Sequence, residues 1–67
     1  MKLSDLRPGD RIRTTRSWEC VPDGAVRVVR QGNLGLYVKC REGEHYLDGQ
    51  RGEGDEPEEL SGLKRAK

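Results

Sequence analysis

The stretch Ala25–Asp48, AVRVVRQGNLGLYVKCREGEHYLD, combines apolar residues, strand-forming residues and turn signals over its whole length. Apolar side chains recur at every second position from Leu34 to Cys40, which is the alternation of a strand with one buried face. Turn residues before and after this run predict antiparallel neighbours on both sides. The stretch is therefore predicted to be a three-stranded meander.

The hairpins of this meander have a predicted register. A two-residue turn at Glu42–Gly43 places Val38 opposite Leu47, so that apolar side chains meet across the hairpin. A three-residue connection ending at Leu34 places Val28 opposite Val38. The core predicted from this register consists of Val26, Val28, Leu36, Val38 and Leu47.

Length and composition predict one small domain with a thin core. A chain of 67 residues buries only about 60% of the surface that its unfolded form exposes. Hydrophobic residues make up 31% and charged residues 37%, and Phe is absent. No apolar run reaches the roughly eighteen residues of a membrane span, and the N-terminus has no secretory pattern. We therefore expect a soluble cytoplasmic protein whose two cysteines are reduced.

The segments before the meander also carry structural signals. Leu3 and Leu6 have the spacing of one helical turn, which Pro8 and Gly9 then end. Residues 10–15 are predicted to form a strand with Ile12 inward and the neighbouring arginines outward. Residues 16–24 contain a Pro-Asp-Gly turn and are predicted to form a loop.

After the meander the composition changes. Residues 49–59 are rich in glycine and carboxylates, and we expect an exposed acidic loop. Leu60 and Leu63 predict a closing strand or helical turn, and residues 64–67 a disordered tail. About five short strands would leave exposed edges if they lay flat, and curling into a barrel removes such edges. An all-β fold with a single domain over residues 1–67 is the prediction.

The order of motifs LRPGDRIR, DGAVRVV, LYVKC and HYL resembles the small SH3-like barrels of the KOW and Tudor kind. This resemblance covers most of the chain. It implies a single SH3-like barrel of about five antiparallel strands that works as a binding module of a prokaryotic type.

Three residues have the chemistry of metal ligands: Cys20, Cys40 and His45. Structural zinc sites use close ligand pairs such as Cys-x-x-Cys, which this chain lacks, and Asp48 is predicted on the opposite face from His45. We therefore predict no metal and no cofactor. His45 and Glu44 point to opposite faces of one strand, and no nucleophile is placed beside them. The chain is predicted not to be an enzyme.

The charge is polarised along the chain although the net charge is only +1. Residues 1–41 hold nine Lys/Arg and four Asp/Glu, whereas residues 42–62 hold one Lys/Arg and eight Asp/Glu. The predicted outer face of the meander interleaves two tyrosines with cations, which suits stacking on bases and contact with phosphates. The candidate nucleic-acid-binding residues are Arg11, Arg13, Arg16, Trp18, Arg27, Tyr37, Lys39, Arg41 and Tyr46.

A protein-interaction module is the alternative function. Its contacts would be Trp18 on the loop, an exposed edge strand or the acidic loop. Trp18 has a second interpretation, in which it closes one end of the barrel in a chain without Phe.

Overall fold

The computed structural model describes residues 1–49 and 60–66. This part of the chain is mostly β, with two short 3-10 helices, η1 (Leu3–Asp5) and η2 (Leu47–Gly49). The strands are β1 (Arg11–Thr14), β2 (Val26–Val28), β3 (Arg30–Gly32), β4 (Gly35–Cys40), β5 (Gly43–Tyr46) and β6 (Leu63–Arg65). The all-β prediction is confirmed.

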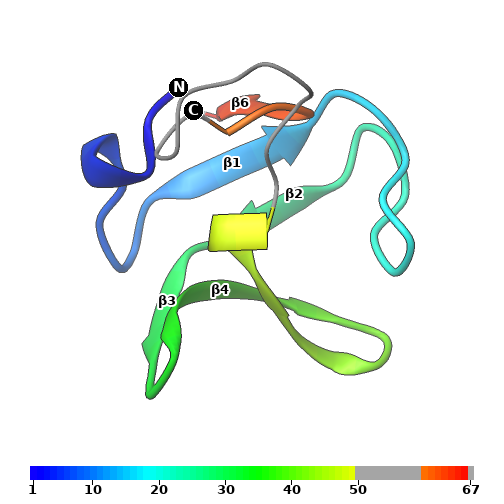
Figure 1. Ribbon diagram of the computed structural model, residues 1–67. Coiled ribbons are helices and arrows are strands. Elements are labelled where there is room, and N and C mark those ends of the chain that lie inside the picture. The colour runs from blue at the N-terminus through cyan, green and yellow to red at the C-terminus, as the bar shows by residue number, and fades with distance from the viewer. Residues whose placement is uncertain (50–59, 67) are drawn as a thin grey trace.

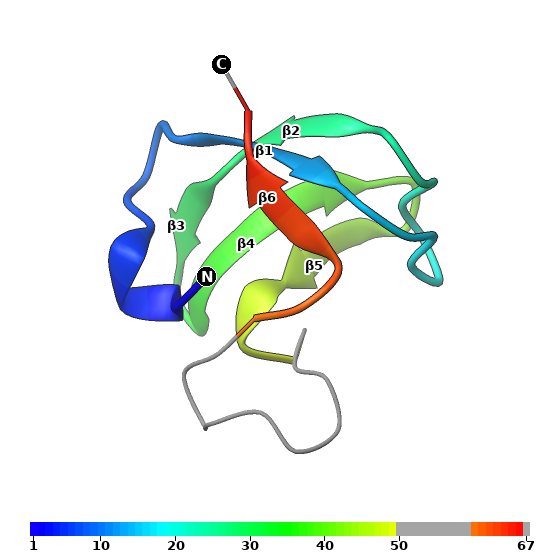
Figure 2. The same cartoon turned by 90° about the horizontal axis from the view of Figure 1, so that it is seen from above.

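The strands form two small antiparallel sheets, ordered β2-β1-β6 and β3-β4-β5 (Figures 1 and 2). Only Val29 separates β2 from β3, so one bent stretch of chain serves both sheets. Bent strands that pass from one sheet to another form the corners of such packings. The predicted continuous meander and the barrel of about five strands are therefore corrected to two separate sheets, with six strands in the part of the chain that the structure describes.

Strand β1 of the first sheet agrees with the sequence pattern. In β1, Ile12 and Thr14 are buried while Arg11 and Arg13 are exposed. Thr14 keeps its hydroxyl satisfied, since Oγ1 donates to the Pro22 carbonyl oxygen at 2.6 Å. The inward Ile12 and outward arginines are confirmed.

Both hairpins differ from the predicted register. Tyr37 pairs with Tyr46, which moves the β4–β5 turn to Arg41–Glu42, and Gly32 pairs with Gly35 around a turn at Asn33–Leu34. In each hairpin the residue that follows the two-residue turn is a glycine with positive φ, +121° at Gly35 and +119° at Gly43. Glycine adopts this conformation readily. The sequence interpretation had placed Gly43 inside its turn.

The two register errors have different consequences. The β4–β5 pairing moves by two residues, so Val38 and Leu47 remain on the buried face and both are 0% exposed. The β3–β4 pairing moves by one residue, and such a shift turns each side chain of the segment that leads into β3 to the other face of the sheet. Val29 is consequently 0% exposed and Val28 is 40% exposed, the reverse of the prediction.

The core lies between the two sheets and is closed by residues from the loop and both ends of the chain. Val26 and Leu36, predicted to be core, are only partly buried. Trp18 is 8% exposed, so its ring belongs to the core. The buried apolar side chains are Leu6, Ile12, Trp18, Val21, Val29, Val38, Leu47, Leu60 and Leu63.

The terminal segments are largely as predicted. The helical turn near the N-terminus is η1, and the segment after Leu60 closes as a strand, β6. Lys64 and Arg65 belong to this strand, which corrects the predicted disordered tail. The acidic loop predicted at 49–59 falls, apart from Gly49, outside the described residues. Within the described ranges, no helix is long and apolar enough to cross a membrane.

Candidate functional site

Two tyrosines lie side by side on the outer face of the β3-β4-β5 sheet. Tyr37 on β4 faces Tyr46 on β5, with ring centroids 5.5 Å apart and the ring planes tilted by 51°. Gly32 of β3 leaves room for them, since a Cβ there would lie 3.0 Å from both the Tyr37 ring and the Tyr46 hydroxyl. The absence of a side chain at Gly32, beside the pair, therefore allows both rings to lie against the sheet.

Charged side chains surround this pair. Arg30 is the β3 partner of Tyr37, and Lys39 lies two residues further along β4, opposite Glu44. All three charged residues are exposed. We call the surface made by Arg30, Tyr37, Lys39, Glu44 and Tyr46 the tyrosine face.

The phenol of Tyr46 is held in its neutral form. Desolvation, followed by the negative charge of Glu44 and the neighbouring Tyr37, raises the pKa of Tyr46. A neutral ring beside two cations presents an apolar stacking surface without adding negative charge.

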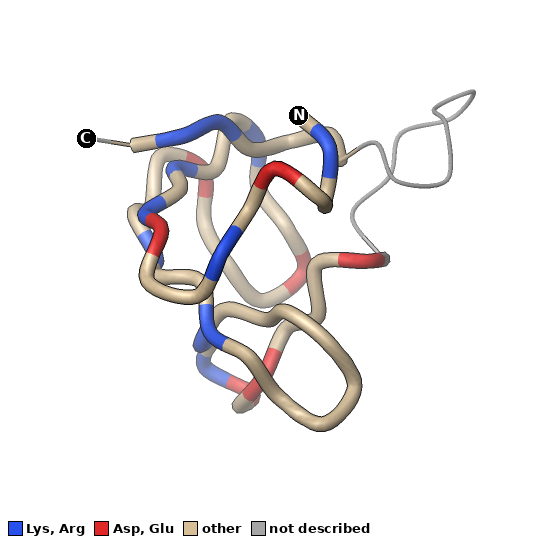
Figure 3. Tube along the Cα trace, turned by 90° about the vertical axis from the view of Figure 1, so that its left-hand side faces the viewer, with Lys and Arg blue, Asp and Glu red and all other residues tan. Residues whose placement is uncertain are grey.

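The outer face of the other sheet carries a second group of cations. Arg11 and Arg13 pair with Val28 and Val26, and Arg13 also pairs with Lys64 of β6. Directly paired residues of antiparallel strands share a face. We call the surface made by Arg11, Arg13 and Lys64 the arginine face. Figure 3 shows most Lys and Arg segments in the left half of its view.

The structure separates the other predicted cations from these faces. Arg27 is half-buried at the junction of the sheets, where its Nε donates to the Lys39 carbonyl oxygen at 3.2 Å. Arg16 lies on the loop and donates to the Ser61 hydroxyl at 3.3 Å. Arg41 lies in the β4–β5 turn. The predicted continuous surface is thus corrected to two faces and a loop region.

Trp18, His45 and Cys20 form a cluster at the end of the core. The Trp18 and His45 rings stack with centroids 4.9 Å apart and planes 22° apart. The Cys20 Sγ lies 3.0 Å from His45 Nδ1. Desolvation, a hydrogen bond with the Cys40 thiol and nearby negative charge raise the pKa of Cys20 to about 11. The Cys20 thiol is therefore protonated at neutral pH and lies within hydrogen-bond distance of His45 Nδ1.

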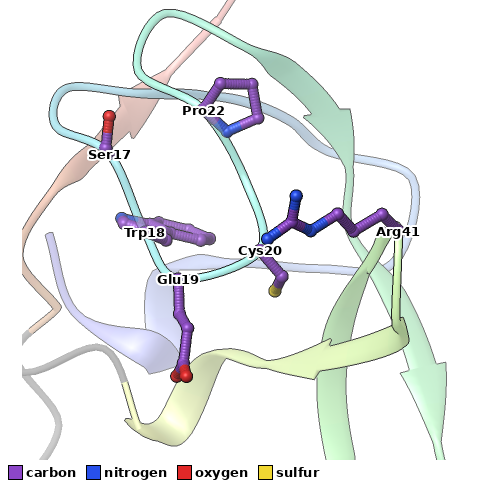
Figure 4. Close-up of a pocket in the computed structure, with 6 residues that line it drawn as sticks. All are labelled: Ser17, Trp18, Glu19, Cys20, Pro22 and Arg41. Carbon is purple, nitrogen blue, oxygen red and sulfur yellow. The ribbon is translucent and has the colours of Figure 1, made fainter.

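An open pocket of about 300 Å³ lies beside this cluster. Figure 4 shows Arg41 extending from the β4–β5 turn toward the loop that carries Trp18 and Cys20. One wall is thus aromatic and another cationic. The lining residues are Ser17, Trp18, Glu19, Cys20, Pro22 and Arg41.

Sequence reasoning missed Arg30 and Lys64 as surface cations and did not bring Cys20 to His45. Arg30 was missed because the one-residue register error assigned its place on the face to Arg27 and Val29. A glycine directly after each pair of turn residues was the signal for the correct register. The approach of Cys20 to His45 joins residues 25 positions apart, and no local pattern encodes such a contact.

Among residues 1–49 and 60–66, no group of three His, Cys, Asp or Glu side chains is arranged to hold a metal ion. Comparison of the chain with models of known protein families, with curated proteins and with solved structures finds no significant match.

Proposed function

We propose that the protein is a non-enzymatic module that binds single-stranded nucleic acid through the tyrosine face. The observation that supports this proposal is the Tyr37–Tyr46 pair, 5.5 Å between ring centroids, with exposed Arg30 and Lys39 beside it on one face. Aromatic rings that stack on bases and cations that follow the backbone are the two elements of such binding sites.

The geometry fits a single strand better than a duplex. The tyrosines lie on the surface of a sheet, where unstacked bases can reach them, whereas duplex bases are covered by their neighbours. Glu44 opposes Lys39 across the hairpin and reduces the local positive charge. Affinity should consequently depend on stacking as much as on phosphate contacts.

The proposed architecture is an open relative of the SH3-like barrels. The bend at Val29, which lets one stretch of chain serve both sheets, supports this assignment. In this arrangement Tyr37 lies on the central strand β4 and Tyr46 on the neighbouring strand β5.

An amide chemical-shift titration tests the proposed function. Short single-stranded oligonucleotides should shift the amides of β4 and β5 around Tyr37 and Tyr46, and duplexes of the same length should bind more weakly. Arg30→Ala should reduce affinity, whereas the matched control Arg11→Ala, on the arginine face, should have a smaller effect. Absence of shifts on the tyrosine face at millimolar oligonucleotide concentration would contradict the proposal.

A protein-interaction module is the second candidate, and the pocket beside Trp18 is the observation that favours it. An apolar wall next to the Arg41 guanidinium suits a peptide that presents an apolar side chain and a carboxylate. Binding there should depend weakly on salt, because it uses one charge pair, whereas multiple phosphate contacts give a steep dependence. The position of the shifts and the salt slope therefore separate the two functions.

A further inference from the structure

The Cys20 thiol lies beside the imidazole of His45, and its hydrogen bond with the Cys40 thiol contributes to its raised pKa. The proposed function uses none of these groups. Cys40 and His45 share the inner face of the second sheet, since His45 pairs with Val38 and Cys40 lies two residues further along β4. Such diagonal positions lie about 7–8 Å apart. Cys20 approaches them from the loop, with Sγ 3.0 Å from His45 Nδ1.

The loop that carries Cys20 is held by one hydrogen bond within the loop and by two contacts of Trp18 with other segments. The backbone N–H of Trp18 donates to the Val21 carbonyl oxygen at 2.8 Å, which closes the loop around Glu19 and Cys20. The Trp18 indole donates to the Gly62 carbonyl oxygen at 3.2 Å and stacks on His45. The position of the Cys20 thiol beside His45 is thus set by the packing of this loop.

We propose that Cys20 and Cys40 are a reversible redox pair that closes into an intramolecular disulfide by exchange with a small-molecule disulfide of the glutathione type, with His45 as the proton acceptor for Cys20. The disulfide would tie the Ser17–Pro22 loop to the end of β4, beside the pocket that Trp18 and Arg41 line.

The two cysteines have different roles in this exchange. Cys20 is a poor first nucleophile, because its pKa of about 11 keeps it protonated at neutral pH and the thiolate is the attacking form. The Cys40 thiolate therefore attacks one sulfur of oxidised glutathione, and the first glutathione thiolate leaves. The product is a mixed disulfide on Cys40.

The second step closes the ring. Cys20 Sγ attacks Cys40 Sγ while its proton passes to His45 Nδ1 across the 3.0 Å contact. The second glutathione thiolate leaves and takes the proton from the imidazolium. In total the two cysteines lose two electrons and two protons, and one oxidised glutathione becomes two glutathione thiols.

Intact-mass measurement on the full chain tests the proposal. The reduced protein is incubated with oxidised glutathione in metal-free buffer. Samples are taken over time and quenched with acid, and the intact mass of the protein is measured in each. The wild type should lose two hydrogen atoms, carry no lasting adduct and yield one linked peptide containing both cysteines. Cys20→Ser should retain one glutathione on Cys40, and Cys40→Ser should react at least about tenfold more slowly.

The His45→Gln variant isolates the proton transfer. Glutamine cannot accept the Cys20 proton, so the mixed disulfide should accumulate and close at least about tenfold more slowly than in the wild type. Amide spectra of each variant verify that the fold is retained.

Other outcomes would overturn the inference. A wild-type protein that keeps its glutathione adduct, or that forms disulfides only between chains, has thiols that do not meet. Thiols that react only after a chelator has been added would identify a metal site instead. A Cys40→Ser variant that reacts as fast as the wild type would reverse the assigned roles.

Discussion

Trp18 Nε1 donates a hydrogen bond to the carbonyl oxygen of Gly62, 44 positions away in the sequence, at 3.2 Å. Gly62 has a φ of +80° and lies just before β6. The same indole ring stacks on His45 of β5. Trp18 therefore connects the loop to both sheets, and its buried ring closes the end of the core.

Gly62→Ala should destabilise the protein strongly. A Cβ at this position would lie 2.5 Å from the Arg16 Nε and 2.9 Å from the Trp18 Nε1. The alanine would also have to keep the left-handed backbone conformation of Gly62, which costs a non-glycine residue about 1–2 kcal/mol. We expect the free energy of unfolding to fall by about 2–4 kcal/mol in urea denaturation.

Gly24→Ala is the matched control for this prediction. Gly24 has nearly the same φ, +78°, but a Cβ there would meet nothing within 4 Å. This variant should lose only the conformational cost of about 1–2 kcal/mol. Equal losses in the two variants would show that the Trp18–Gly62 approach is looser than the structure indicates.

Val29→Ala and Val28→Ala compare two neighbouring valines with opposite burial. Val29 is 0% exposed in the core and Val28 is 40% exposed on the arginine-face side of its sheet. Removing two methyl groups should cost about 2–3 kcal/mol at Val29 and less than about 1 kcal/mol at Val28. Thermal or urea unfolding measures both values, and the reverse order would restore the register expected from the sequence.

Asp10→Asn should change the acid sensitivity of the protein. The Asp10 carboxylate accepts a hydrogen bond from the Arg7 N–H at 2.9 Å and from the Arg65 guanidinium at 3.0 Å. These bonds hold the pKa of Asp10 below its ordinary value of 3.8. Because the folded pKa is lowered, the stabilisation is present above pH 3.8 and is lost as the pH falls through the folded pKa.

The measurement is the difference in unfolding free energy between wild type and Asp10→Asn as a function of pH. This difference should be constant near neutral pH and should shrink as the pH falls below 3.8. Arg65→Gln, which leaves the Arg7 hydrogen bond intact, should show a smaller change. A difference that does not vary with pH would mean that these bonds do not persist in solution.

The sequence was sufficient to predict the elements that depend on local patterns. The alternation around Ile12 and Val38 identified β1 and β4 together with their buried faces, and Leu3 with Leu6 identified η1. The register of β3 was predicted wrongly, because the connection before Gly35 was taken as three residues and the signal of a glycine directly after a two-residue turn was not used. Because of this shift by one residue, Val29 and not Val28 is buried in the core, and Arg30 and not Arg27 lies beside Tyr37 on the outer face.

Contacts between distant segments were the other part that local patterns did not reveal. The burial of Trp18 agrees with its expected place at the end of the core, but its partners His45 and Gly62 both lie far along the sequence from it. The approach of Cys20 to His45 depends on the same tertiary packing. The candidate site was thus predicted in its residue types and only in part in its arrangement.

The tyrosine face makes separate predictions for stacking and for charge. Tyr37→Ala should weaken binding to single-stranded oligonucleotides by about 1–3 kcal/mol with little change in salt dependence, because it removes stacking alone. Tyr37→Phe is the matched variant, and it should retain most of the affinity because the ring remains.

Lys39→Ala and Arg30→Ala should instead weaken binding to all sequences alike and reduce the slope of log affinity against log salt by about one unit each. Lys39 and Arg30 flank Tyr37 on the same face, whereas Lys64 lies on the arginine face and serves as the control of equal charge. Affinity titrations at several salt concentrations measure both quantities. A slope that falls with Lys64→Ala and stays unchanged with Lys39→Ala would move the binding surface to the arginine face, because the slope counts the phosphates that each cation neutralises.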